Sequence, residues 1–292
     1  MPIDAPPGAR FLVIVLAAQR AGAADPLALK HGVTHKCLVP LNGRPLIEYV
    51  LTTLARHPAV TGITVSVEYE IFDMVHWIGM GIAGTHAPIT CVASRDNLAD
   101  SVISAAAGHD GPILITTADN ALLGASGVQA MLDALDKGSD VAIAMARREA
   151  VLAAHPDGQR RFYRFSDDAY SNCNLYAIAG AHALAAAEIF RGGGQFAKKA
   201  GRIVEAFGLW NLLLLRLRLV SLEGGLRRMS RRTGLNIAPV ILAEGRQAID
   251  VDNERTHAVA ASLLSRLPSG FIDAANAEAC PAQVCRPQAM QT

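Results

Sequence analysis

The residues with the clearest capacity for chemistry are three aspartates that follow apolar segments. Asp119 ends the run Pro112–Ala118, and Asp250 and Asp252 stand two residues apart just before Asn253-Glu254. In an extended segment the side chains of Asp250 and Asp252 point the same way, because strands alternate with period two. Neighbouring carboxylates repel each other, and a hard divalent cation bound through oxygen relieves that repulsion. Helix capping is the alternative function of these aspartates.

A second candidate is the loop of small residues after the first apolar run. The run Phe11–Ala18 leads into Gln19-Arg20-Ala21-Gly22. Beyond the carboxyl end of a parallel strand, such a loop lets backbone N–H groups approach phosphate oxygens. Arg20 and Lys36 add mobile positive charge, which a triphosphate needs. The alternative is an ordinary strand-to-helix connection with two solvated cations.

The segment Ser171–Tyr176 offers a third set of polar side chains. Alternation along a strand places Asn172, Asn174 and Tyr176 on one face. Such a face either lines a binding pocket or pairs with neighbouring polar groups. The sequence has no GxxxxGK phosphate loop, no GxSxG elbow and no HExxH pair, so the chemistry of those motifs is not indicated.

These residues need a sheet that brings the ends of several strands together. Apolar runs of strand length alternate with helix-like segments, which is typical of successive βαβ units with right-handed crossovers. The predicted strands are Phe11–Ala18, Ile63–Val67, Ile89–Ala93, Ile113–Thr117 and Val141–Met145, and the predicted helices are Leu46–His57, Tyr69–Ile78, Asp100–Gly108 and Val128–Lys137. The expected fold is a three-layer α/β/α arrangement with a mostly parallel, twisted sheet.

The pattern changes after Arg147. It predicts two strands that pair later or at the sheet edge, then a helix, two returning strands and a closing helix. These segments are, in order, Arg161–Phe165, Ser171–Ala177, Ala181–Arg191, Ala238–Leu242, Gln247–Val251 and Glu254–Leu267. We expect one domain over residues 1–267, followed by a frayed tail over 268–292.

A long apolar and basic segment interrupts this second half. Val204–Leu222 is predicted to form a helix that is apolar all round, within a helical insertion over about 196–234. Residues 214–232 carry six arginines and one glutamate, a net charge of +5. The insertion packs on the domain, packs on a second copy of the chain in a homodimer, or contacts an anionic membrane surface through residues 204–232.

Composition narrows the classes of function. Of the 292 residues, 51% are hydrophobic and 18% charged, which excludes a mostly disordered chain. A formal net charge of +1 argues against nucleic acid as a partner held by bulk electrostatics. No stretch reaches about 18 uncharged apolar residues, and the first residues lack the pattern of a signal peptide. A cytoplasmic location is expected, with the inner face of the membrane as the site of any lipid contact.

Several of these segments together resemble the MobA-like NTP transferases, which are nucleotidyltransferases with a glycosyltransferase-A-like fold. The resemblance covers about residues 10–267 and is carried by Lys36–Ile47, above all Lys36 and Gly43-Arg44-Pro45-Leu46-Ile47, and by Thr116–Leu123 and Ile249–Glu254. The N-terminal loop departs from the family pattern, because Gln19 and Ala21 stand where glycines are usual.

The resemblance implies transfer of a nucleoside monophosphate from an NTP to a phosphorylated acceptor, with release of pyrophosphate. It implies Mg²⁺ held by Asp119 and Asp252, and catalytic functions for Lys36, Arg20 and Asp119. The implied nucleotide-binding residues are Leu16, Ala17, Ala18, Gln19, Arg20, Lys36, Asn97, Asp100 and Ser101, and the implied acceptor-binding residues are Asn172, Asn174 and Asp250.

The base and the acceptor stay open in the sequence. A sugar, polyol, cofactor or lipid phosphate are all acceptable acceptors, and the apolar segment Val204–Leu222 motivates the lipid. Two other functions are alternatives. One is a glycosyltransferase of the same fold that consumes a nucleotide sugar. The other is a catalytically silent nucleotide-binding regulator, which the unusual loop at Gln19 motivates.

Overall fold

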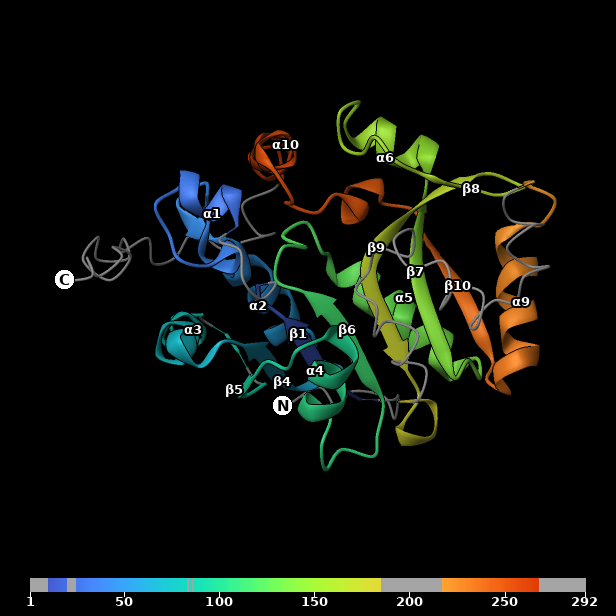
Figure 1. Ribbon diagram of the computed structural model, residues 1–292, viewed down its shortest axis with the longest axis horizontal. Coiled ribbons are helices and arrows are strands. Elements are labelled where there is room, and N and C mark those ends of the chain that lie inside the picture. The colour runs from blue at the N-terminus through green and yellow to red at the C-terminus, as the bar shows by residue number, and fades with distance from the viewer. Residues whose placement is uncertain (1–9, 20–24, 83, 86, 185–216, 268–292) are drawn as a thin grey trace, which may run out of the picture.

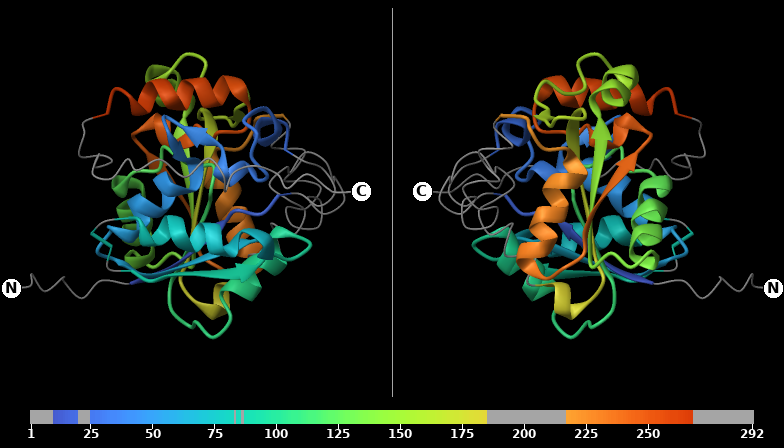
Figure 2. Two further views of the ribbon diagram at one scale, coloured as in Figure 1. Left: turned by 90° about the vertical axis from the view of Figure 1, so that its left-hand side faces the viewer. Right: turned by 90° about the vertical axis from the view of Figure 1, so that its right-hand side faces the viewer.

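A twisted sheet with helices on both faces forms the centre of the protein (Figures 1 and 2). The computed structural model describes residues 10–19, 25–82, 84–85, 87–184 and 217–267. Seven strands lie side by side in the order β10-β7-β9-β6-β1-β4-β5, and β8 pairs with β9. Their bounds are β1 Phe11–Leu16, β4 Val60–Val67, β5 Ile89–Ala93, β6 Ile113–Thr117, β7 Val141–Arg147, β8 Tyr163–Arg164, β9 Ala169–Ile178 and β10 Ile237–Leu242. The α/β prediction is confirmed.

Most neighbouring strands of this sheet run parallel, as expected. β1 pairs in parallel with β4 and β6, β4 with β5, and β7 with β10. The carboxyl ends of these strands therefore meet at one edge, where ligands bind in folds of this type. β9 runs antiparallel between β6 and β7, so its first residues reach the same edge.

Two apolar cores flank the sheet, one on each face. Along β1, Val13 and Val15 face one core and Ile14 faces the other, as strand alternation requires. The first core packs beneath α1 Pro26–Lys30, α2 Leu46–Ala55, α3 Phe72–Met80, α5 Ala125–Asp136, α6 Arg148–Ala154 and α10 Glu254–Leu264. The second packs beneath α4 Leu98–Ala105 and α9 Leu222–Thr233. Figure 2 shows α5 and α9 on opposite sides of the sheet.

A short hairpin leads the chain into α2. The strands β2 (Pro40–Leu41) and β3 (Arg44–Pro45) pair antiparallel around the turn Asn42-Gly43. Both turn residues have positive φ, 48° and 83°, which Asn and Gly tolerate best. The turn places the 3₁₀ helix Lys36–Leu38 directly before α2, since the amide of Leu46 donates to the carbonyl of Val39 at 3.0 Å.

Two predictions for the second half need correction. The segment Ser171–Ala177 belongs to β9, which lies in the middle of the sheet and not at its edge. The predicted strand Gln247–Val251 is wrong. Gly245–Ala248 forms a 3₁₀ helix, because the Gln247 side chain bonds the N-terminal end of α5 and a Cβ at residue 245 would meet the backbone of Ala150.

The predicted insertion is described only from residue 217 onward. Residues 217–221 are not helical, although the run Val204–Leu222 predicts a helix there. α9 begins at Leu222 because the Ser221 hydroxyl accepts the amide of Gly224 at 3.1 Å. Residues 196–216, most of the predicted helix Ala181–Arg191 and the tail 268–292 lie outside the described residues. Within the described part of the chain, no helix has the length and apolar character to cross a membrane.

Candidate active site

Lys36 lies between two carboxylates that are far apart in the sequence. Its Nζ donates to Asp119 Oδ2 at 2.5 Å and to Asp252 Oδ1 at 2.7 Å. The three groups come from the 3₁₀ helix Lys36–Leu38, from the segment after β6 and from the segment before α10. The side chains of Lys36 and Asp119 are mostly buried, 19% and 18% exposed, whereas Asp252 is 63% exposed. One side of the cluster is therefore open to a ligand.

One backbone hydrogen bond and one side-chain hydrogen bond fix Asp119 and connect it to the segment that carries Asp252. The amide of Val251 donates to the carbonyl of Asp119 at 3.1 Å and thereby ties the two acidic segments together. The Thr117 hydroxyl donates to Asp119 Oδ1 at 2.5 Å. The other oxygen of Asp119 faces Lys36, so both oxygens of this buried carboxylate are engaged.

Helix capping does not account for these aspartates. β6 ends at Thr117, and α5 begins only at Ala125, with Gly124 as its N-cap. Asp119 lies between the two and does not cap α5. α10 is capped by Asn253, whose side chain accepts the amide of Thr256 in a capping box. Other residues, Gly124 and Asn253, thus cap these two helices, and the three aspartates do not.

Opposite charges determine the protonation of Lys36. Burial acts to lower its pKa, but Asp119 and Asp252 act more strongly in the other direction and hold the pKa above its ordinary value. Lys36 therefore stays an ammonium group at all physiological pH values. A charged group between two carboxylates can exchange them for the oxygens of a bound phosphate.

Asp250 lies deeper, beneath the same cluster. It is 6% exposed, and its Oδ2 accepts the Asn174 side-chain amide at 2.7 Å. Its Oδ1 is buried without a hydrogen-bond partner. Burial, together with the charges of Asp119 and Asp252, raises the pKa of Asp250 well above its ordinary value.

A bulge in β9 aims its asparagines at this cluster. Ile143 of β7 faces Tyr176, but Met145, two residues further, faces Asn172, four residues back along β9. Asn174 takes up the excess with φ of 46°. The Asn172 side chain donates to Asn174 Oδ1 at 3.0 Å and to the Tyr176 hydroxyl at 2.5 Å. The expectation that these three side chains lie together is confirmed.

The described part of the N-terminal loop is held by a carboxylate that sequence reasoning missed. The amide of Gln19 donates to Glu68 Oε1 at 2.7 Å, and the Gln19 side chain donates to the carbonyl of Thr34 at 2.9 Å. Glu68 follows β4 directly, and β4 is the neighbour of β1. An acidic residue at the carboxyl end of that strand was the signal that could have identified it. Arg20 lies outside the described residues.

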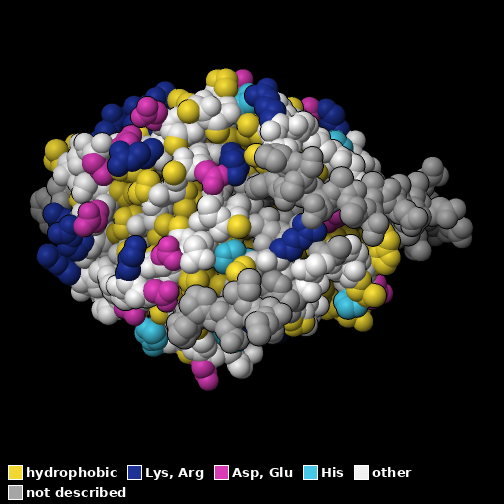
Figure 3. Space-filling model, turned by 180° about the vertical axis from the view of Figure 1, so that it is seen from behind, with side chains coloured by type: hydrophobic (Ala, Val, Ile, Leu, Met, Phe, Trp, Pro, Cys, Tyr) yellow, Lys and Arg dark blue, Asp and Glu magenta, His cyan; other side chains and the backbone are white. Residues whose placement is uncertain are grey.

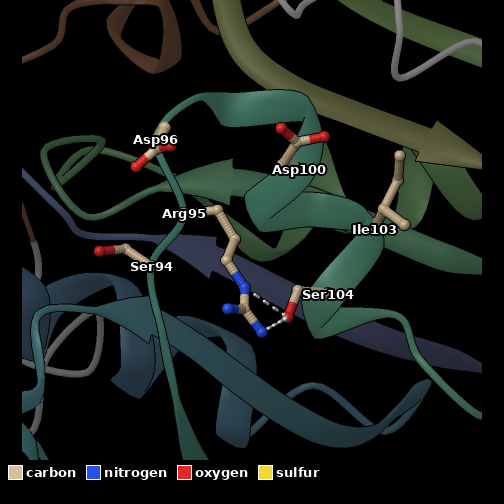
Figure 4. Close-up of a pocket in the computed structure, with 6 residues that line it drawn as sticks. All are labelled: Ser94, Arg95, Asp96, Asp100, Ile103 and Ser104. Carbon is tan, nitrogen blue, oxygen red and sulfur yellow. Dashed lines mark hydrogen bonds between the residues drawn. The ribbon is translucent and has the colours of Figure 1, made fainter.

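The residues expected to meet the base and ribose lie at the start of α4. Asn97 caps this helix by accepting the amide of Asp100 at 3.0 Å, and the Ser101 hydroxyl accepts the amide of Arg95 at 2.9 Å. A hollow of about 420 Å³ lies on the outer side, lined by Ser94, Arg95, Asp96, Asp100, Ile103 and Ser104. Figure 4 shows the Arg95 guanidinium crossing it to the Ser104 hydroxyl, at 3.2 Å. Ser101 is buried and does not line it.

The carboxylates suit a magnesium ion only if a ligand completes its shell. Among the described residues, no group of three or more His, Cys, Asp and Glu side chains could hold a metal by itself. Mg²⁺ commonly takes one or two carboxylates together with substrate phosphates and waters. The pair Asp119 and Asp252, with the unpartnered Oδ1 of Asp250 behind it, fits that donor set.

The fold defines a class. A mostly parallel α/β sheet of this topology, with polar residues gathered at the carboxyl edge of its strands, is typical of nucleotidyltransferases. A family model described as a MobA-like NTP transferase domain matches residues 13–233. The chain belongs to this family.

Solved structures support the same fold. A transferase of hypothetical assignment from Thermus thermophilus is 24% identical, with a TM-score of 0.65, covering 85% of this chain and 99% of the other. The 4-diphosphocytidyl-2C-methyl-D-erythritol synthase of Anaerococcus prevotii is 12% identical, with a TM-score of 0.56, covering 88% and 99%. A CMP:2-keto-3-deoxy-manno-octonic acid synthetase complexed with CTP is 14% identical, with a TM-score of 0.53, covering 88% and 98%. No curated protein matches the chain.

Proposed function

We propose that this protein transfers a nucleoside monophosphate from an NTP to a phosphorylated acceptor and releases pyrophosphate. The observation that carries the proposal is the contact of Lys36 with both Asp119 and Asp252. A phosphoryl-transfer site needs positive charge beside carboxylates that can hold a metal, and this cluster supplies both. Family membership supports the same reaction class.

The proposed reaction is an in-line displacement at the α-phosphorus. An oxygen of the acceptor phosphate forms a new P–O bond there, while the bond to the β-phosphate breaks and pyrophosphate leaves. Positioning and charge neutralisation dominate such a step. Lys36 would donate to an α-phosphate oxygen, in exchange for one of its carboxylate partners. Asp119 and Asp252 would hold Mg²⁺, which when bound supplies charge neutralisation at the phosphates.

The nucleotide would lie along the carboxyl edge from β1 towards β5. Backbone amides of Leu16, Ala17, Ala18 and Gln19, with Arg20, are the proposed phosphate ligands. Two of these amides already have partners and would have to exchange them for phosphate oxygens. The amide of Ala17 donates to the carbonyl of Ser66 at 2.9 Å, and the amide of Gln19 donates to Glu68 Oε1 at 2.7 Å. Asn97, Asp100 and Ser101 are the proposed contacts to the nucleoside, and the hollow beside Asp100 lies at the end of β5.

The acceptor would approach from the β9 side of the cluster. Asn174 carries a side-chain amide there that Asp250 fixes, and the amide of Asn172 would bind the acceptor in exchange for Asn174 or Tyr176. Amide donors suit hydroxyl and phosphate oxygens alike, so a sugar, polyol, cofactor or lipid phosphate all agree with this geometry. Two of the structural neighbours are, by name, synthases of a cytidylylated polyol and of a CMP-sugar, which makes CTP and a sugar or polyol phosphate the first pair to test.

The decisive experiment measures pyrophosphate release. The full chain is incubated with each NTP, Mg²⁺ and a panel of phosphorylated acceptors. Asp119→Asn and Asp252→Asn should each lower turnover by about 10²-fold or more, since each removes a carboxylate that would hold Mg²⁺, and the metal would neutralise charge in the transition state. Asp136→Asn, at the exposed end of α5, is the matched control and should retain full activity.

Three outcomes would contradict the proposal. Full activity in both aspartate variants would remove the carboxylate pair from the mechanism. Release of free NDP from a nucleotide sugar, without pyrophosphate from any NTP, would assign the protein to glycosyl transfer. Nucleotide binding without turnover over the whole acceptor panel would favour the silent regulator.

A further inference from the structure

A row of arginines covers the outer face of α9. Leu222, Leu226 and Met229 of this helix are buried against the sheet. The exposed arginines are Arg227, Arg228, Arg231 and Arg232. At about 100° per residue, they span an arc of about 140° on the side opposite the buried residues. The apolar side of α9 is thus used by the fold, and the arginine side faces solvent.

Positive charge is concentrated in α9 and the residues just before it. Residues 217–233 contain five arginines, one of which is Arg218, and one glutamate, so their net charge is +4. Since the whole chain carries +1, the remainder carries −3. Figure 3 shows lysine and arginine side chains gathered at the left-hand edge of the molecule, over α9. Within the helix, Arg227 pairs with Glu223 at 3.0 Å, which offsets part of this charge.

Two large apolar side chains stand beside the arginines. Leu217 and Leu219, just before α9, are 55% and 65% exposed. The chain is fixed here, because the amide of Ser166 donates to the carbonyl of Val220 at 3.0 Å and the amide of Leu222 donates to Asp167 at 3.1 Å. We call residues 217–219 and the arginine face of α9 the arginine–leucine surface.

This surface begins at the same edge of the sheet as the candidate active site. Ser166 and Asp167 lie in the turn between β8 and β9, and Tyr170, just beyond it, pairs with Arg147 at the carboxyl end of β7. The exposed leucines are therefore at the edge where Asn172 begins the polar face of β9. α9 runs from this edge along the outermost strand β10 (Figure 1).

We propose that the arginine–leucine surface docks the protein on a bilayer that contains anionic lipids. Arginines pair with lipid phosphates through their planar guanidinium groups, and basic clusters next to apolar side chains are typical of peripheral membrane contacts. The leucines distinguish this partner from nucleic acid, whose surface offers no apolar layer for Leu217 and Leu219. The helix would lie on the headgroups without entering them, because its apolar side packs on the sheet. The proposal does not depend on the proposed function.

Vesicle flotation tests the proposal with the full chain. The protein should float with vesicles of phosphatidylcholine and phosphatidylglycerol, and far less with phosphatidylcholine alone or at high salt. Each arginine near an anionic surface contributes about fivefold to partitioning, so Arg231→Gln with Arg232→Gln should weaken it about thirtyfold. Leu217→Ser with Leu219→Ser should weaken it further, independently of salt.

A charge-matched variant keeps the test specific. Lys137→Gln with Arg266→Gln also removes two exposed positive charges, at the ends of α5 and α10, and should partition as the unchanged protein does. Equal partitioning of the Arg231/Arg232 variant and the unchanged protein would overturn the proposal, as would equal flotation with neutral and anionic vesicles. Tighter binding to a DNA duplex than to anionic vesicles at the same salt would assign the surface to nucleic acid. Melting temperatures verify that each variant is folded.

Discussion

At the scale of single residues, the site concentrates charge that the fold alone does not require. Three carboxylates lie near the ammonium group of Lys36, and two of them, Asp119 and Asp252, accept hydrogen bonds from it. Asp250 is buried behind them with one oxygen unpartnered. Buried unpaired polar atoms destabilise a protein unless a ligand or a function compensates. Asp250 therefore lowers the stability of the folded protein, and no structural role explains why a carboxylate stands there.

Asp250→Asn should stabilise the protein at neutral pH. The raised pKa means that the folded state holds the Asp250 proton more tightly than the unfolded chain does. Asp250 thus favours folding below its unfolded pKa of 3.8, and that contribution is lost as the pH rises through the folded pKa. The amide keeps an acceptor for Asn174, so the expected gain is about 1 kcal/mol, or about 2–4 °C in Tm.

Thermal unfolding measured from about pH 4 to about pH 8 checks this sign. The difference between the variant and the unchanged protein should grow as the pH rises. A variant that is less stable at neutral pH, or a stability difference independent of pH, would show that the charged form of Asp250 does not destabilise the folded protein. Asp136→Asn serves as the control at an exposed position.

At the scale of elements, the bulge in β9 decides which side chains reach the site. In a regular strand that pairs Ile143 with Tyr176, Met145 would face Asn174. Because of the bulge, Met145 faces Asn172 and the Asn174 side chain bonds Asp250. The φ of 46° at Asn174 is a left-handed conformation that Asn and Gly adopt with little strain. The bulge therefore depends on the residue at this position.

Substitutions at Asn174 separate the backbone from the hydrogen bond. Asn174→Gly and Asn174→Ala both remove the bond to Asp250, but only alanine is strained at positive φ, so it should be less stable than glycine by about 1 kcal/mol. At Asn172, which has ordinary φ, the order should reverse, because glycine costs about 0.5–1 kcal/mol in a strand. Chemical denaturation of the four variants measures both differences. The same order at both positions would contradict the bulge.

At the scale of the whole molecule, one edge of the sheet gathers every candidate group. Lys36, Asp119 and Asp252 come from three parts of the chain, and the β8–β9 turn brings the start of α9 to the same edge. A ligand that binds across these parts stabilises them together, because it binds the folded state and not the unfolded chain.

NTP together with Mg²⁺ should therefore raise the melting temperature of the protein. At a ligand concentration of about 100 times Kd, the expected stabilisation is about 2.7 kcal/mol. A screen of the four NTPs by differential scanning fluorimetry identifies the base, and Asp119→Asn should abolish the part of the shift that needs Mg²⁺. No shift with any NTP would contradict nucleotide binding at this edge.

Local patterns were sufficient for most of the sheet. Apolar runs predicted β1, β4, β5, β6, β7 and β10 to within a few residues. Four of these strands, β1, β4, β6 and β7, are mostly buried, and burial on both faces makes such strands continuously apolar. They failed at Gln247–Val251, where a strand was predicted. The Gln247 side chain bonds Gly124 and Ser126, and the backbone closes into a 3₁₀ turn. A contact between segments over 120 residues apart overrides local preference there.

The sequence by itself determined that this chain is an α/β protein of the nucleotidyltransferase type, and which aspartates stand at the ends of its segments. Only the tertiary structure decided that Lys36 lies between Asp119 and Asp252, that Glu68 holds the amide of Gln19, and that β9 enters the middle of the sheet. Hydrophobic periodicity is a property of neighbouring residues and can be seen in the chain. Contacts across many residues arise only when the packed core has set the order of the strands.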